Sequence, residues 1–356
     1  MIKVLELFSG IGACSEALTN LGIEHEIVDA VEIDKYAVQS FNAIHGTNFE
    51  VQDITEWDKD IECDLIMHGS PCQDFSVAGK GAGGDKDSGT RSSLMYETLR
   101  IVEKLKPKYV IWENVKNLLS KKHRHNFDAY LVRMRELGYV SNFKVLNARD
   151  YGIPQNRERV FTVSIYLPEQ AKQIGGEDLI GLGLFNFPEP RPLEKRLKDV
   201  LEDEVDEKYY LTQAQIDRMK NTNFNCSKLE TRVQDENEVA RTLCARDYKD
   251  PKCVRLGGLY DKEGEKHQAG GIYDPRGISA TLDTMSGGNR EPIILEDNCR
   301  IRKLTPKECW RLMSFSDASF DRAKASGISN SQLYKQAGNS IVVKVLEAIL
   351  GNLIPR

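Results

Sequence analysis

The first half of the chain alternates apolar runs with amphipathic stretches of helical spacing. Residues 4–8 and 26–33 have the composition of buried strands, and the helical stretches at 13–21 and 36–44 each end close to a glycine. The alternation continues to about Tyr166. A repeated strand and helix pattern of this kind predicts an α/β fold with parallel strands and helices on both faces of the sheet.

Two glycines follow the first predicted strand. Gly10 and Gly12 precede the first helix, and Glu32 lies twenty residues beyond Gly12, at the end of the second strand. This spacing is typical of a Rossmann-like nucleotide-binding turn in which the acidic residue binds ribose hydroxyls. Ser15 occupies the place of the third fingerprint glycine, which favours an adenosyl ligand smaller than a dinucleotide. A nicotinamide oxidoreductase is the alternative, but it leaves the residues described next without a role.

One cysteine stands beside a proline just beyond the apolar run 63–68. Cys72 follows Pro71 and precedes a glycine-rich segment. Open α/β sheets bind their ligands at the carboxyl ends of the strands, so a thiol at this point is a candidate nucleophile. A buried structural thiol is the alternative reading.

Two further strand ends carry polar groups. Glu113 and Asn114 follow the apolar run 108–112, which predicts that they lie at the same edge of the sheet as the cysteine. Arg157 and Arg159 are two positions apart on an extended segment, so their side chains are expected to point the same way and could bind a carbonyl or phosphate oxygen.

Taken in order, these blocks resemble the DNA cytosine-5 methyltransferases, which use S-adenosylmethionine. Small departures exist, such as Ser9 where the family often has alanine and Gln52 where it often has glycine. Nine matching blocks run nearly from end to end, at residues 7–12, 32–34, 53–54, 71–73, 91–94, 113–115, 155–159, 302–308 and 336–340.

The resemblance implies a covalent mechanism. Cys72 would attack C6 of cytosine and activate C5 for methyl transfer, while Glu113 would bind N3 and the exocyclic amine. Arg159, and more weakly Arg157, would hold the cytosine O2, and Asn114 would orient the loop that carries the cysteine. Because the target atom is inaccessible in a stacked duplex, the cytosine would be flipped out, and residues 80–89 would form a loop that closes over it.

The resemblance also implies which residues bind S-adenosylmethionine. Glu32 would bind the ribose, Ile33 would stack on the adenine, and the remaining residues would line the adenine edge and the methionine part. The full predicted set is Phe8, Gly10, Gly12, Glu32, Ile33, Asp53, Ile54, Pro71, Leu94, Asn339 and Ser340.

The alternation stops at about residue 168, and helical spacing returns near the C-terminus. The resemblance implies a discontinuous Rossmann-like catalytic domain with a mixed, mostly parallel sheet, residues 1–167 plus 328–356, and a smaller β-rich target-recognition domain at 168–327. In the family the C-terminal segment crosses back to the first domain. The expected contacts to double-stranded DNA are Ser76, Lys80, Arg241, Arg246, Lys249 and Arg290, together with Asn289.

Composition and charge limit how the protein can bind DNA, whether it holds a metal and where it is located. The formal net charge is −5, so DNA binding must come from a local cleft and not from a broadly basic surface. The 8 cysteines contain no C-x-x-C pair, and no metal site is expected. No apolar run reaches the length of a membrane span and no signal peptide is recognisable, so a cytoplasmic protein is predicted. The resemblance implies a monomer, with a cognate restriction endonuclease as a possible companion.

Two alternatives share the motifs. A tRNA methyltransferase would keep the same chemistry, but about 130 residues separate the catalytic blocks here, which favours DNA. A non-catalytic relative normally loses the Pro-Cys pair or the glutamate, and both are intact.

Overall fold

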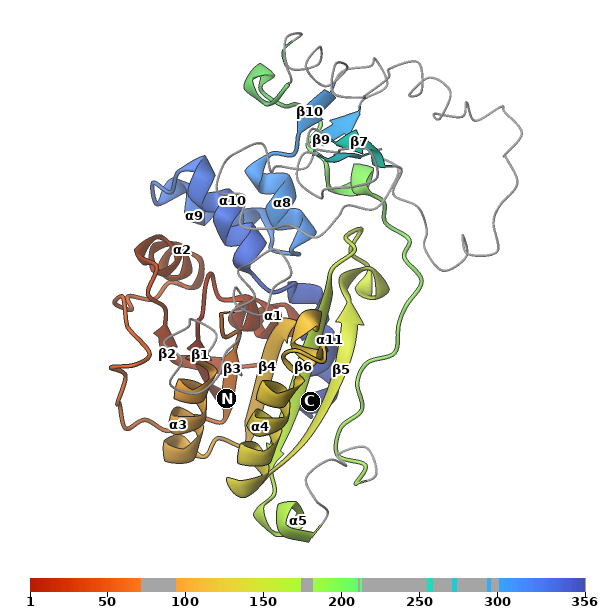
Figure 1. The fold of residues 1–356 in the computed structure, drawn as a ribbon. Coiled ribbons are helices and arrows are strands. Elements are labelled where there is room, and N and C mark those ends of the chain that lie inside the picture. The colour runs from red at the N-terminus through yellow and green to blue at the C-terminus, as the bar shows by residue number, and fades with distance from the viewer. Residues whose placement is uncertain are drawn as a thin grey trace, which may run out of the picture.

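The computed structural model describes residues 1–71, 94–173, 182–210, 212, 255–258, 271–273, 293–295 and 301–355. Its centre is a six-stranded sheet in the order β2-β1-β3-β4-β6-β5 (Figure 1). β6 alone runs against its neighbours, so the sheet is mixed and mostly parallel, as predicted. The strands are β1 (Ile2–Leu7), β2 (His25–Val31), β3 (Leu65–His68), β4 (Tyr109–Val115), β5 (Tyr139–Asn147) and β6 (Glu158–Tyr166).

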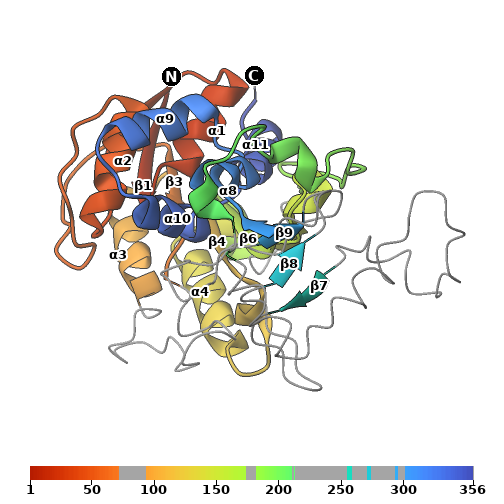
Figure 2. The ribbon, with the colours of Figure 1, turned by 90° about the horizontal axis from the view of Figure 1, so that it is seen from above.

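Helices cover both faces of this sheet. α3 and α4 lie on one face, and α1 and α11 lie on the other (Figures 1 and 2). α1 and α2 end at Gly22 and Gly46, each in the left-handed conformation that glycine adopts without strain. The helices are α1 (Ala13–Leu21), α2 (Lys35–His45), α3 (Met95–Leu105), α4 (Arg124–Glu136), α5 (Pro168–Gln173), α8 (Pro306–Leu312), α9 (Asp317–Ala325), α10 (Asn330–Asn339) and α11 (Val343–Leu353).

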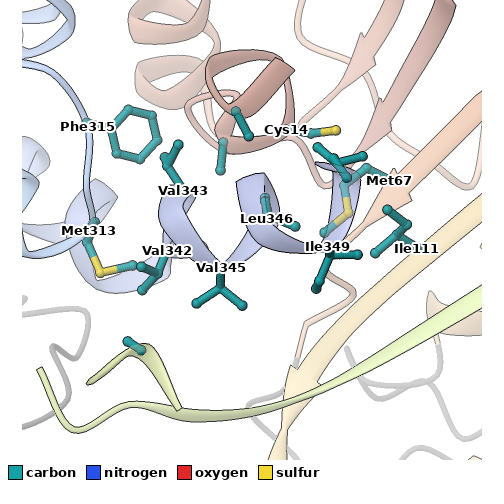
Figure 3. Packing of buried hydrophobic residues seen from close by; sticks show 14 of the residues in the cluster. Cys14, Met67, Ile111, Met313, Phe315, Val342, Val343, Val345, Leu346 and Ile349 are labelled. Atoms are coloured by element: carbon teal, nitrogen blue, oxygen red, sulfur yellow. The ribbon is translucent and has the colours of Figure 1, made fainter. Parts of the chain in front are cut away.

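α11 brings the C-terminal segment back to the sheet. Its apolar spacing buries Leu346 and Ile349 completely, against Cys14 of α1, Met67 of β3 and Ile111 of β4 (Figure 3). Each such side chain contributes roughly 1.5–3 kcal/mol by leaving water. This packing explains why the last helix of the chain is nearly as apolar as a core strand.

A second, four-stranded sheet lies beyond the carboxyl ends of the parallel strands, far from both termini (Figure 1). β9 pairs antiparallel with β10 and parallel with β8, and β7 pairs antiparallel with β8. Its strands fall inside the segment predicted to be rich in β structure. They are β7 (Arg255–Gly258), β8 (Gly271–Tyr273), β9 (Ile293–Leu295) and β10 (Ile301–Lys303).

The predicted domain limits at 168 and 328 do not coincide with a break in packing. Phe185, Leu197, Trp310 and Phe320 belong to the same buried cluster as α1 and α11. Side-chain bonds add to this contact, since Ser319 Oγ lies 2.9 Å from Glu16 Oε1 of α1. Segments on both sides of the second sheet therefore pack on the catalytic core.

Candidate active site

The turn after β1 has the backbone of a ligand-binding turn. Phe8, Gly10 and Gly12 all have positive φ angles, of 53°, 55° and 81°. A Cβ atom at Gly12 would lie 2.1 Å from the imidazole of His45, so only glycine lets α2 approach the turn this closely. Phe8 is half-buried against the α3 and α4 side of the core, which gives it a packing role as well as its predicted one.

Glu32 follows β2 and closes the same turn. One carboxylate oxygen accepts a hydrogen bond from the Gly10 amide at 3.0 Å, and the other accepts one from the Asp34 amide at 2.8 Å. Burial raises the pKa of Glu32 above its ordinary value, and the two amides oppose that rise. The next residue, Ile33, leaves 67% of its surface in solvent, an unusual position for a large apolar side chain.

The residues predicted at the adenine edge lie on a loop fixed from two sides. Asp53 caps its own turn by accepting bonds from the amide and hydroxyl of Thr55 at 2.9 and 2.8 Å. Arg100 of α3 donates to the carbonyl oxygens of buried Ile54 and of Trp57, both at 2.9 Å. Arg100 thus holds the main chain of this loop in place, a contact that the motif itself does not reveal.

Asp29, buried in β2, is the second anchor of this loop. It accepts hydrogen bonds from Trp57 Nε1 and Gln52 Nε2, both at 2.8 Å, and pairs with Lys59 Nζ at 2.8 Å. Burial alone would raise the pKa of Asp29, but the bonds from Lys59, Trp57 and Gln52 hold it below its usual value. Sequence analysis missed this residue, although a carboxylate inside an apolar run was a signal that could have drawn attention.

One polar atom in the β1 turn suits a polar ligand. Ser9 Oγ is buried and has no hydrogen-bond partner within the part of the chain that the structure describes. Unsatisfied buried hydroxyls are uncommon, because losing water without a replacement costs about 1–3 kcal/mol. A bound group with carboxylate, amine or hydroxyl functions would supply the missing partner, so the turn fits an adenosyl amino acid such as S-adenosylmethionine.

Four other predicted cofactor residues differ in how far they are exposed. Pro71 and Leu94 are half-buried and bracket the undescribed residues 72–93. Asn339 is exposed at the end of α10, and Ser340 after it is buried. An ion pair of 2.6 Å between Lys335 and Asp34 joins α10 to the residue that caps α2.

Glu113 and Arg159 form the charged pair of the site. Their Oε1 and Nε atoms lie 3.0 Å apart, with both side chains largely buried. Burial raises the pKa of Glu113, while the positive charges of Arg159 and Arg157 act in the opposite direction. The prediction placed Glu113 after a strand, but β4 extends through it because β6 pairs along its whole length.

The end of β3 leads directly to this pair. His68 lies opposite Trp112 in the register, so Gly69 falls beside Glu113, and a Cβ on Gly69 would lie 3.7 Å from the carboxylate. Cys72 itself lies outside the described residues, three positions further on.

Ser70 fixes the chain between Gly69 and Pro71. Its hydroxyl accepts a hydrogen bond from Trp112 Nε1 at 3.0 Å, and Asn114 Nδ2 lies 3.3 Å from both its hydroxyl and its carbonyl oxygen. All three side chains are buried. The amide predicted to orient the cysteine loop therefore bonds the backbone two residues before Cys72.

The two arginines have different partners. Arg159 faces Glu113, whereas buried Arg157 donates from Nη2 to the carbonyl oxygens of Ser340 and Gly338 at 2.8 and 3.3 Å. Both still line one small pocket with Glu113, Phe161 and Ile341. The guanidinium of Arg157 is thus tied to the segment that carries the predicted cofactor residues Asn339 and Ser340.

The predicted DNA contacts cannot be placed. Residues 80–89 and the six predicted contact residues, as well as Asn289, lie outside the described part of the chain. In the described ranges, no cluster of His, Cys, Asp and Glu has the make-up of a metal site. None of the helices in those ranges has the length and apolar character needed to cross a membrane. The unplaced contact residues are Ser76, Lys80, Arg241, Arg246, Lys249 and Arg290.

Comparison with known proteins covers the whole chain. Residues 2–355 match the family model described as C-5 cytosine-specific DNA methylase. The orphan methyltransferase M.SPBetaI of Bacillus phage SPbeta is 34% identical, with 99% of this chain and 97% of the relative covered. The type II methyltransferase M.HhaI of Haemophilus parahaemolyticus is 33% identical, with 99% and 94% covered. The crystal structure of S. pombe Dnmt2 methyltransferase matches at a TM-score of 0.68 and 20% identity, with 99% and 98% covered, which supports the fold.

Proposed function

The chain belongs to the C-5 cytosine-specific DNA methylase family, and we propose that Cys72, Glu113 and Arg159 form its reaction centre. It is a DNA (cytosine-5-)-methyltransferase that uses S-adenosylmethionine as the methyl donor. The observation that carries the proposal is the buried pair of Glu113 and Arg159 beside Gly69, at the strand end that leads to the cysteine.

Cys72 is the proposed nucleophile. C5 of cytosine is a weak nucleophile, and addition of a thiolate to C6 converts C5 into the carbon of an enamine. The bonds from Trp112 and Asn114 to Ser70 support this role, because they fix the backbone just ahead of the cysteine at the edge where Glu113 lies. A fixed approach turns an encounter in solution into an oriented one, which accounts for several kcal/mol of many enzymatic barriers.

Glu113 is the proposed acid at N3 of the cytosine. Its raised pKa favours the protonated carboxyl, which can hold a proton at N3 while electrons move into the ring. Arg159 orients the carboxyl at 3.0 Å and offers further N–H groups to the cytosine O2. Arg157 is proposed as a positioning residue, since its guanidinium bonds the backbone at Gly338 and Ser340.

The β1 turn and its neighbours are the proposed S-adenosylmethionine site. When bound, this cofactor supplies a methyl group on a positively charged sulfur. Glu32 would hold the ribose hydroxyls, Ile33 would cover the adenine, and Ser9 Oγ would bond a polar group of the amino-acid part. Asp29 and Arg100 would keep the loop with Asp53 and Ile54 in position.

Residues between the two catalytic segments are the proposed reader of DNA sequence. Packing of Phe185, Leu197 and Trp310 with the core favours a narrower recognition domain than 168–327, centred on the second sheet. We propose that a monomer methylates a short duplex sequence in a bacterial or phage-infected cell, acting on DNA in the cytoplasm. One relative is named an orphan methyltransferase and the other a type II methyltransferase. We therefore propose that the protein is either a phage methylase or the partner of a restriction endonuclease.

A transfer assay tests the proposal. Labelled S-adenosylmethionine and unmethylated bacterial DNA are incubated with wild type, Cys72→Ala and the matched thiol control Cys63→Ala, and products are mapped by bisulfite sequencing. We expect one short motif to be methylated by wild type and by Cys63→Ala only. Retained transfer in Cys72→Ala would contradict the proposed nucleophile, and transfer to tRNA alone would move the substrate to RNA.

A further inference from the structure

A basic segment follows β4 directly. Residues 116–125 contain Lys116, Lys121, Lys122 and Arg124 and no acidic residue, in a chain whose net charge is −5. The three lysines are exposed and Arg124 is partly so. We call these four residues the basic rim. A cluster of this sign on an acidic protein is the kind of local surface that phosphate binding needs.

The basic rim lies at the same edge of the sheet as the reaction centre. Lys116 begins the 3₁₀ turn Lys116–Leu119, three residues beyond Glu113, and its Nζ lies 3.0 Å from Glu158. Glu158 precedes Arg159, which pairs with Glu113. α4 then runs back along the sheet, so its first residue Arg124 is at this edge too. Viewed from the side of the second sheet, α4 lies beside β4 and β6 (Figure 2).

The exposed ion pairs of the basic rim contribute little to folding. The pairs of Lys116 with Glu158 and of Arg124 with Asp128 are exposed, and such pairs contribute only about 0–1 kcal/mol. α4 has no acidic residue in its first turn, and its cap residue His123 makes no capping hydrogen bond with its side chain. Positive side chains at the start of a helix are unfavourable, because they oppose the helix dipole.

We propose that the basic rim binds backbone phosphates of the DNA duplex next to the flipped cytosine. The catalytic domain would then grip the DNA backbone on its own edge, while the recognition domain reads bases. Contacts of this kind fix the register of a protein on DNA and carry no sequence information. The inference rests on the proposed function, since a duplex must lie across this edge for the cytosine to reach Glu113.

The test uses the full chain with Lys121→Gln/Lys122→Gln. Its control, Lys106→Gln/Lys108→Gln, removes two exposed lysines near the start of β4, at the opposite end of the same strand. DNA affinity is measured by fluorescence anisotropy from 50 to 300 mM salt, on a duplex with the methylated motif and on a scrambled duplex. S-adenosylmethionine binding is measured by calorimetry.

We expect the rim variant to bind both duplexes about 10-fold more weakly at moderate salt, with the slope of log K against log salt reduced by about 1 per lysine. The control should match wild type, both variants should bind S-adenosylmethionine normally, and Lys121→Arg/Lys122→Arg should restore the slope. An unchanged slope in a variant that still methylates DNA would overturn the inference and leave the proposed function intact. A wild type that neither binds nor methylates DNA would overturn both.

Discussion

The proposed cofactor half and the proposed reaction centre of this sheet are assembled in different ways. The β1 turn, Glu32 and the loop at 52–59 come from one stretch of chain and are held largely by bonds to backbone amides and carbonyls. The reaction centre joins Ser70, Glu113 and Arg159, which are far apart in the sequence, through single side chains. Substitutions in the proposed cofactor half should therefore lower activity moderately, whereas substitutions in the proposed reaction centre should lower it steeply.

The steepest expected loss is at Glu113. Glu113→Gln keeps the shape of the side chain but cannot deliver a proton, so kcat should fall roughly 10²–10⁴-fold with unchanged binding of S-adenosylmethionine. Single-turnover kinetics and calorimetry would check this. As the matched control, Glu158→Gln removes an exposed carboxylate at the start of β6 and should leave kcat near that of wild type. A loss of only a few fold at Glu113 would place the proton elsewhere.

Substitution of Arg157 tests whether the structure of the proposed reaction centre depends on one buried cation. Arg157→Met leaves the carbonyl oxygens of Gly338 and Ser340 without their donor, which should lower the free energy of unfolding by roughly 2–4 kcal/mol. Urea denaturation measures this change. Arg135→Met on the exposed face of α4 is the control, and an equal loss in both variants would remove the special role of Arg157.

Glu6 is expected to make the stability of the folded protein depend on pH. It is buried in β1, and burial raises its pKa to about 7, against hydrogen bonds from Ser15. Because the folded state holds this proton more tightly than the unfolded state, stability should fall as pH rises from about 4.5 through 7, by about 2–3 kcal/mol. Glu6→Gln should lack this part of the decline in urea titrations at several pH values. Parallel curves for the two proteins would contradict the assignment.

The smallest effect is expected at Asp29, which anchors the loop at 52–59. Asp29→Asn keeps acceptor capacity but loses the charge that pairs with Lys59, so KM for S-adenosylmethionine should rise about 10-fold while kcat and KM for DNA stay near wild type. Steady-state kinetics with either substrate varied would separate these constants. A fall in kcat instead would contradict the proposed difference between the cofactor half and the reaction centre.

The sequence predicted the sheet and its helices well because both depend on local patterns. The ends of α1 and α2 fall at the predicted glycines, since positive φ is a property of the residue itself. The end of β4 was predicted three residues too early, because its length is set by pairing with β6, which is distant in the chain. The composition of a strand does not show how far a distant strand pairs along it.

The site was predicted less evenly. The structure places Glu113 next to Arg159 and Asn114 next to Ser70, and the catalytic roles of these residues stay predictions. The separate partners of Arg157 and the anchoring role of Asp29 were missed. Both depend on contacts made by remote segments, which single-sequence patterns do not encode.

The position of α11 has a consequence for how the protein is made. The surface that it covers, including Cys14, Met67 and Ile111, is complete once β6 has been translated, but α11 follows β6 by more than 170 residues. At about 5–20 residues per second, the ribosome needs roughly 10–35 s to reach it. Until α11 is made, this apolar face lacks the helix that covers it in the folded protein.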